Sequence, residues 1–259
     1  MAVLIGHLST VVAAAFGAVI GSFLNVCIYR LPIGRSIVWP ASACPHCDRQ
    51  LAWLENIPIA SYLALGRRCR TCRAPISFRY PAVEAITALM FALGWFYLGP
   101  SVLLASRLVL GCALIVLFAI DVTHHLLPNV ITLPGIVIGF AFSVVTEPGW
   151  IPSLAGIVAG GGVLFAIAQT YYWIRHEEGL GMGDVKMLAM IGAFLGWKLT
   201  LVTLMLSSVS GSVVGVYFLA TGRGDLKYAL PFGAFLALGA AAAAIVGPGL
   251  LDWYLGLSS

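Results

Sequence analysis

Two aspartates are the residues of this sequence best suited to carry out a reaction, because each lies at one end of a long apolar stretch. Asp121 follows the apolar run at residues 111–120, and Asp184 lies in the motif Gly181-Met182-Gly183-Asp184-Val185-Lys186, where another apolar segment begins. A carboxylate at a membrane boundary is energetically costly and is therefore first interpreted as functional. The hypothesis is that Asp121 and Asp184 meet and hydrolyse a peptide bond.

Two neighbouring carboxylates can hydrolyse a peptide bond by taking different roles in the reaction. When they lie within about 3 Å of each other they cannot both ionise, so one of them keeps its proton. The ionised carboxylate takes a proton from the attacking water. The protonated carboxyl group hydrogen-bonds the scissile carbonyl oxygen and later helps the nitrogen to leave. Either aspartate fits either part.

The residues around Asp184 weigh against a purely structural role. In the structural alternative, Asp184 pairs with Lys186, and Asp121 pairs with a neighbouring histidine. Such pairing does not require glycine, whereas Gly181 and Gly183 permit close backbone approach beside the acid. The predicted site therefore includes these two glycines and Lys186 as its supporting motif.

The composition is that of an integral membrane protein. Hydrophobic residues make up 61% of the 259 residues and charged residues only 9%, whereas a soluble domain carries about 25% charge. The mean hydropathy is +1.00. The net charge of +4 is too small, and the chain too apolar, for a nucleic-acid surface. The lipid bilayer is therefore an expected partner and nucleic acid is not.

Eight apolar segments predict an all-α, polytopic membrane protein with about eight transmembrane helices. The chain divides into a first transmembrane helix at residues 1–29, a cysteine-containing loop at 30–80, and a core of about seven helices at 81–259. The sixth segment spans about 20 Å against a hydrocarbon core of about 30 Å, so it starts below the surface or is re-entrant. The segments are residues 5–29, 81–98, 102–120, 130–146, 153–174, 185–197, 199–220 and 230–254.

The basic residues set the expected orientation. Eight of the 14 lysines and arginines lie within residues 30–79, and cytoplasmic loops are enriched in these residues. With this loop in the cytoplasm, the alternation of eight spans places Asp121 and residues 175–186 on the cytoplasmic side and both chain ends outside. The two aspartates are thus expected to share one membrane face.

Four cysteines in the loop have the spacing of a zinc site. Cys44 and Cys47 form one Cys-x2-Cys pair and Cys69 and Cys72 form another, with 21 residues between the two pairs. Each pair lets two sulfurs reach one tetrahedral ion, and four thiolates leave no open position, so a structural zinc ion is favoured. Four unligated cysteines are the alternative. Disulfides are less favoured in the reducing cytoplasm.

Further motifs lie around the cysteines and the aspartates. They are Gly21-Ser22-Phe23-Leu24-Asn25-Val26-Cys27-Ile28-Tyr29-Arg30-Leu31-Pro32 before the loop, Ile76-Ser77-Phe78-Arg79-Tyr80-Pro81-Ala82-Val83-Glu84 after it, and Leu127-Pro128-Asn129 after Asp121. In this order the motifs resemble those of the bifunctional type 4 prepilin peptidases, which are also N-methyltransferases. The resemblance covers about residues 17–197.

The resemblance implies both an activity and a location. Family members cut the basic leader from prepilins and pseudopilins of type IV pilus and type II secretion systems. They do so at the cytoplasmic face of the bacterial inner membrane, and then methylate the new N-terminal residue with S-adenosylmethionine. The resemblance also implies that Asp121 and Asp184 are catalytic and that the four cysteines bind zinc. The methyl-donor site has no sequence motif; Glu84 is a candidate polar group for it.

Three other functions fit the same residues. The chain could be a peptidase without methyltransferase activity, or an assembly protein that docks through its zinc loop. It could also be a proton-coupled transporter that uses the paired aspartates as a relay. A transporter is expected to have inverted repeats and an acid near the bilayer midplane, and the sequence shows neither feature.

Overall fold

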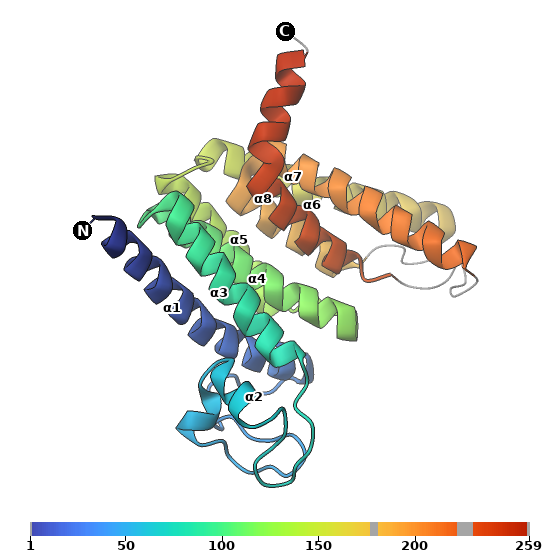
Figure 1. Ribbon diagram of the computed structural model, residues 1–259. Coiled ribbons are helices and arrows are strands. Elements are labelled where there is room, and N and C mark those ends of the chain that lie inside the picture. Colours follow the sequence, from blue (N-terminus) through green and yellow to red (C-terminus); the bar gives the residue numbers. More distant parts are fainter. Residues whose placement is uncertain (1, 177–180, 222–229, 258–259) are drawn as a thin grey trace. The chain divides into compact units, whose positions relative to one another are not determined.

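The computed structural model describes residues 2–176, 181–221 and 230–257, and in these ranges the chain is helical, without a β-strand (Figure 1). The predicted all-α fold is confirmed. Residues 177–180, part of the segment expected on the cytoplasmic side, lie outside the described residues. The helices are α1 Ala2–Arg30, α2 Ala60–Ala64, α3 Arg79–Leu98, α4 Val102–His124, α5 Asn129–Val145, α6 Trp150–Arg175, α7 Met182–Ala220 and α8 Phe232–Leu257, with short 3-10 turns at Leu31–Ile33 and Trp53–Asn56.

The predicted apolar segments all fall on helices. Among the described residues, six helices are long and apolar enough to cross a membrane: α1, α3, α4, α6, α7 and α8. The apolar helix α5 is shorter, with 17 residues. The sixth and seventh predicted segments lie together in α7. The protein is therefore a multi-pass membrane protein.

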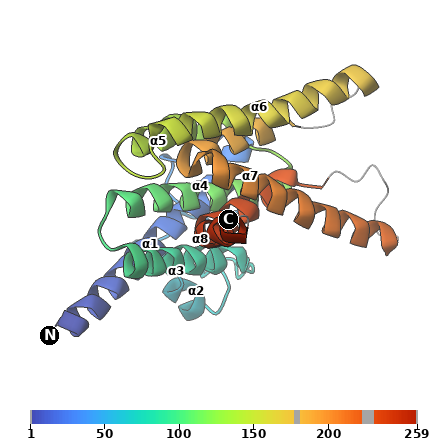
Figure 2. The same ribbon diagram turned by 90° about the horizontal axis from the view of Figure 1, so that it is seen from above.

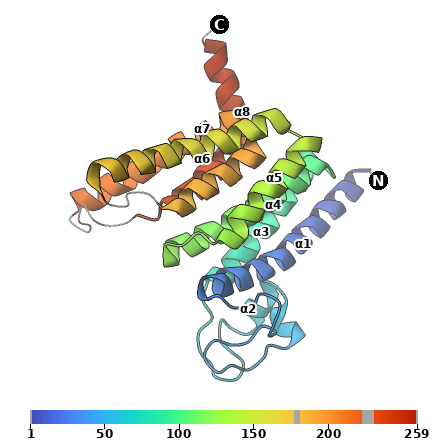
Figure 3. The same ribbon diagram turned by 180° about the vertical axis from the view of Figure 1, so that it is seen from behind.

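Two compact units make up the chain, residues 1–116 and 117–259, and the division falls within α4. The first unit is built on α1 and α3, which pack side by side (Figures 1 and 3). A Cβ added to Gly21 of α1 would lie only 2.7 Å from the Cα of Glu84 in α3. Glycine therefore lets these two backbones approach, as small residues do between membrane helices. Residues 31–78 connect the two helices and form the cysteine loop.

Helix α7 turns sharply at Gly196, where φ is +74° and ψ is 168°. A Cβ on Gly160 of α6 would lie 2.7 Å from the Leu188 carbonyl oxygen and 3.1 Å from Thr200 Cγ2. Twelve residues of straight helix would separate Leu188 from Thr200 by about 18 Å. The chain therefore folds back on itself at Gly196, close to the end of the predicted segment at residues 185–197.

The first leg of α7, residues 182–195, is the core of the second unit. Residues 187–196 are all buried, as expected for a helix that is apolar all round. Figure 2 shows α6 running beside α7, and glycines Gly156 and Gly192 bring the two backbones into contact. The hydroxyl groups of Ser143 and Ser153 both donate to the Ala193 carbonyl, at 2.8 and 2.7 Å. They supply hydrogen bonds for a carbonyl close to the end of this leg.

Candidate aspartate pair and cysteine cluster

Asp121 lies in the last turn of α4 and is only 5% exposed. The helix ends just beyond it because His125 takes a left-handed conformation, with φ +49°, and its N–H bonds the Asp121 carbonyl at 2.9 Å. Such a left-handed residue is a common end to a helix. The Asp121 side chain reaches the start of α8, where its Oδ2 accepts a hydrogen bond from the Ala234 N–H at 2.8 Å.

The N-terminus of α8 is a part of this site that the sequence analysis missed. The first N–H groups of a helix have no intrahelical partner and favour a nearby negative charge, and here they meet Asp121. A Cβ on Gly233 would lie 3.0 Å from Asp121 Oδ2, so glycine makes room for the carboxylate. The sequence Pro231-Phe232-Gly233 marks a helix start, but it does not say which side chain that start will face.

Asp184 is the third residue of α7, after the N-cap residue Gly181 and the helical residues Met182 and Gly183. This position places a carboxylate within the first turn, where the helix dipole favours it. The Asp184 side chain is turned back to Gly181, whose added Cβ would lie 3.3 Å from Asp184 Oδ2. Asp184 is 9% exposed, and its carboxyl group is close enough to that of Asp121 for the two to interact electrostatically.

Leu127 contacts a glycine beside each of the two aspartates. Its side chain is 9% exposed and lies against Gly183, where an added Cβ would come within 2.9 Å of Leu127 Cβ. The same side chain lies against Gly233, within 2.9 Å of the position of an added Cβ. The loop after α4, the start of α7 and the start of α8 therefore meet here, and they bring Asp121 and Asp184 together.

The structural pairing of Asp184 with Lys186 is not formed. The Lys186 ammonium group instead donates to Asn129 Oδ1 at 3.0 Å, which links the first turns of α7 and α5. Within the described ranges, the one salt bridge is Arg49–Glu55, in the cysteine loop. The supporting lysine therefore holds two helix starts together. His125 lies close enough to Asp121 to interact with it electrostatically, but within the described ranges neither aspartate forms a salt bridge.

The four loop cysteines converge in the first unit. The sulfur atoms of Cys44, Cys47, Cys69 and Cys72 all lie within 4.8 Å of one another, and the Cys44 and Cys72 sulfurs are 3.8 Å apart. A tetrahedron with zinc–sulfur bonds of about 2.3 Å has edges of about 3.8 Å. The cluster therefore has the donor set and nearly the dimensions of a four-thiolate metal site.

The two Cys-x2-Cys pairs have the same local backbone. The Cys44 N–H bonds the Arg49 carbonyl at 3.0 Å, and the Cys69 N–H bonds the Ala74 carbonyl at 2.9 Å. The residue after each second cysteine is left-handed, with φ +52° at Asp48 and +59° at Arg73. The sequence spacing thus produces two equivalent turns that each present two sulfurs.

Backbone N–H groups also stabilise the thiolate form of Cys69. The N–H groups of Cys72 and Thr71 hydrogen-bond the Cys69 sulfur, and these bonds lower the pKa of the Cys69 thiol to about 6. Metal ligation requires the thiolate form of cysteine. The loop therefore stabilises the form of Cys69 that binds a cation.

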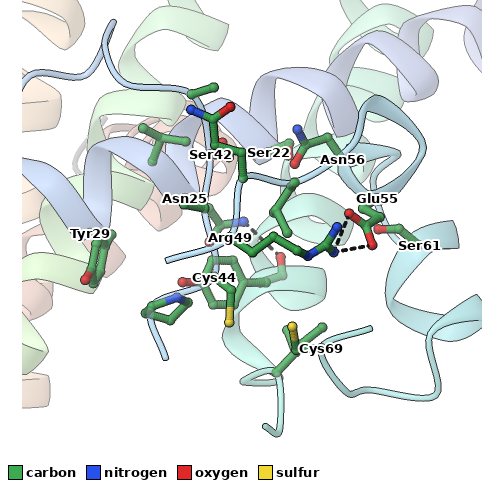
Figure 4. Close-up of a pocket in the computed structure, with 18 of the residues that line it drawn as sticks. Ser22, Asn25, Tyr29, Ser42, Cys44, Arg49, Glu55, Asn56, Ser61 and Cys69 are labelled. Atoms are coloured by element: carbon green, nitrogen blue, oxygen red, sulfur yellow. Dashed lines mark hydrogen bonds and ion pairs between the residues drawn. The ribbon is translucent and has the colours of Figure 1, made fainter. Parts of the chain in front are cut away.

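A cavity of about 670 Å³ adjoins the cysteine cluster, with a wall from α1, α3 and the loop (Figure 4). Small-molecule sites in proteins typically have volumes of about 300–1,000 Å³. Glu84 lines this cavity, and its Oε2 accepts a hydrogen bond from the Ile59 N–H at 2.8 Å. Ile59 is strained, with φ +62°, so Glu84 fixes an unfavourable turn of the loop.

These features define a class: multi-pass helical membrane proteins with buried paired aspartates and a four-cysteine loop. Residues 108–216 match the family model described as "Type IV leader peptidase family", and residues 15–98 match "Bacterial Peptidase A24 N-terminal domain". No solved structure matches the chain.

Three relatives, each named "Prepilin leader peptidase/N-methyltransferase", show the same relationship. The Pseudomonas putida protein is 39% identical over 87% of this chain and 86% of its own length. The Myxococcus xanthus protein is 42% identical over 84% and 66%, and the Aeromonas hydrophila protein is 36% identical over 93% and 91%. The chain belongs to the type IV leader peptidase family.

Proposed function

We propose that this protein is an aspartyl endopeptidase of the bacterial inner membrane. It removes the leader of prepilins or pseudopilins at the cytoplasmic face and then methylates the new N-terminal residue. The observation that carries this proposal is the meeting of Asp121 and Asp184 at the ends of α4 and α7. A substrate with an apolar helix in the membrane and a basic leader outside it presents its cleavage bond at such a boundary.

The aspartates perform the cleavage as a pair. One carboxylate takes a proton from water, and the resulting hydroxide attacks the scissile carbonyl carbon. The other carboxyl group donates a hydrogen bond to the carbonyl oxygen and then gives its proton to the leaving nitrogen. The N–H groups at the start of α8 hold Asp121 in place, and Gly183 leaves room for Leu127 beside Asp184. The site is thereby ordered before substrate binds.

The first unit holds zinc and supplies the methyl-transfer half. Zinc is the metal best matched to four thiolates at this spacing, and it stabilises a loop that has little apolar core. S-adenosylmethionine, when bound, supplies the methyl group that the new N-terminal amine accepts. The cavity beside the cysteine loop is large enough for it.

The product mass tests both halves of this proposal. We expect the purified protein, incubated with a prepilin and S-adenosylmethionine, to release a substrate that lacks its leader and carries one added methyl group. An intact substrate would contradict the peptidase assignment. A trimmed product without a methyl group would contradict only the methyl-transfer half.

Zinc removal should unfold the cysteine loop. We expect the double substitution Cys69→Ser, Cys72→Ser to lower the bound zinc from about one ion per chain to nearly none, because it removes two of four ligands. Elemental analysis of the purified protein measures this, and limited proteolysis detects the loosened loop. Cys112→Ser, which changes a cysteine of α4 outside the cluster, should keep the zinc. Equal zinc in wild type and the double variant would refute the assignment.

A further inference from the structure

Buried polar atoms without a hydrogen-bond partner are concentrated in residues that line the cavity beside the cysteine loop. Over the described residues, four buried side-chain atoms lack a hydrogen-bond partner, and three of them belong to residues in the wall of this cavity. Buried polar groups are nearly always paired, so each exception requires an explanation. The three atoms are Asn25 Oδ1, Arg49 Nε and Arg79 Nε; the fourth, Ser106 Oγ, belongs to a residue outside the wall.

Asn25 lines the cavity, and its buried amide oxygen is an acceptor with a fixed orientation. Its side chain is on α1 and is 3% exposed, and its Nδ2 donates to the Tyr80 carbonyl at 3.0 Å. Because only the amide nitrogen can donate to a carbonyl, this bond sets the orientation of the amide. The oxygen Oδ1 is left without a donor among its neighbours. Figure 4 shows Asn25 among the residues that line the cavity.

Two arginines of the same wall have unused donors. The Arg49 Nη2 bonds both carboxylate oxygens of Glu55, at 2.6 and 2.8 Å, which positions the guanidinium and leaves Nε unpaired (Figure 4). Arg79 is the first residue of α3 and adjoins Tyr80, the partner of Asn25, and its Nε is also unpaired. A guanidinium group is the side chain best suited to bind a carboxylate.

We propose that this wall binds the amino-acid end of S-adenosylmethionine. The α-ammonium group donates to Asn25 Oδ1, and the α-carboxylate accepts hydrogen bonds from Arg79 and Arg49. This inference rests on the proposed methyl transfer and identifies the residues that recognise the donor. The N-terminus of a trimmed pilin has the ammonium group but no adjacent free carboxylate, so it would leave the Nε donors of both arginines unpaired. Arginine N–H groups together with an amide oxygen therefore match the amino-acid end of S-adenosylmethionine better than they match the N-terminus of a trimmed pilin.

Binding measurements on the full-length protein test this assignment without turnover. Titration calorimetry compares S-adenosylhomocysteine, which has the amino-acid end, with 5′-methylthioadenosine, which lacks it. In Asn25→Ala and Arg79→Gln we expect the Kd for S-adenosylhomocysteine to rise at least about tenfold, the size of a lost charge-assisted hydrogen bond. The Kd for 5′-methylthioadenosine should stay that of the wild type. Arg68→Gln, an exposed loop arginine outside the wall, is the matched control and should change neither Kd.

Each other outcome has a definite meaning. An unchanged Kd for S-adenosylhomocysteine in both variants, or an equal loss for both nucleosides, overturns the assignment of the amino-acid end. An unchanged Kd combined with a raised KM for a trimmed pilin peptide assigns Asn25 to the acceptor amine and also overturns it. A wild-type protein that binds no S-adenosylhomocysteine contradicts the proposed methyl transfer itself. Zinc content, measured in parallel, verifies that the variants keep their loop.

Discussion

We expect Asp121→Asn and Asp184→Asn each to reduce leader removal by about 10²–10⁴-fold, the contribution of a general acid or base. Asparagine has nearly the same shape as aspartate, so packing around the site is preserved. At position 121 its amide oxygen can still accept the hydrogen bond from the Ala234 N–H. Neither amide can take a proton from water or give one to the leaving nitrogen. The expected loss is therefore chemical and should not come from unfolding.

The measurement is the initial rate of prepilin cleavage by purified protein. The matched control is Asp252→Asn, which changes an exposed aspartate of α8 in the same unit and should cleave at the wild-type rate. Zinc content should be equal in all three variants because the cysteines belong to the other unit. Wild-type cleavage by either Asp121→Asn or Asp184→Asn would remove the aspartate pair from the mechanism.

A transporter that uses the aspartates as a relay would respond differently to the same changes. Loss of either acid would abolish proton-coupled uptake and would have no consequence for a prepilin. The site described here has both acids at helix ends, with Asp121 in the last turn of α4 and Asp184 in the first turn of α7. Such an arrangement fits a reaction at a helix boundary better than a pathway across the bilayer.

Much of the fold follows from local sequence. Apolar length alone located the eight helical segments, because a membrane helix must satisfy its backbone within itself. The cysteine cluster followed from spacing, since two Cys-x2-Cys turns present four sulfurs whatever the rest of the loop does. Close packing of α6 against another helix was also foreseeable from Gly160-Gly161-Gly162, although the sequence does not say that the partner is α7.

The remaining parts of the site depend on tertiary partners that no local pattern specifies. A helix start at Phe232 was foreseeable, but its contact with Asp121 joins residues 113 positions apart. The unpaired Asn25 oxygen is visible only once Tyr80 has taken the amide nitrogen. The sequence predicted separate segments at residues 185–197 and 199–220, so a reversal near their junction was expected, but its position at Gly196 needed the structure because a glycine in an apolar run is compatible with a continuous helix.

The three consecutive glycines of α6 should differ sharply when each is changed to alanine. At Gly160 the new Cβ would lie 2.7 Å from the Leu188 carbonyl oxygen and 3.0 Å from its carbon. These are backbone atoms of a buried helix and cannot rotate away. At Gly161 the nearest atom is the Ala189 Cβ at 3.4 Å, an ordinary contact, and at Gly162 nothing lies within 4 Å.

We therefore expect Gly160→Ala to lower the free energy of unfolding by roughly 1–3 kcal/mol, the usual cost of an overpacked core, while Gly161→Ala and Gly162→Ala change it little. The gain in helix propensity is the same at all three positions, so the differences between the variants report the contact with Leu188.

Leu188 lies one turn beyond Asp184, and a displacement of about 1 Å at a catalytic group can cost about 10²-fold in rate. Gly160→Ala should therefore also slow prepilin cleavage. Thermal unfolding in detergent and the cleavage rate measure the two effects. Equal unfolding temperatures and cleavage rates for the three variants would mean that the contact between Gly160 and α7 does not constrain the helix that carries Asp184.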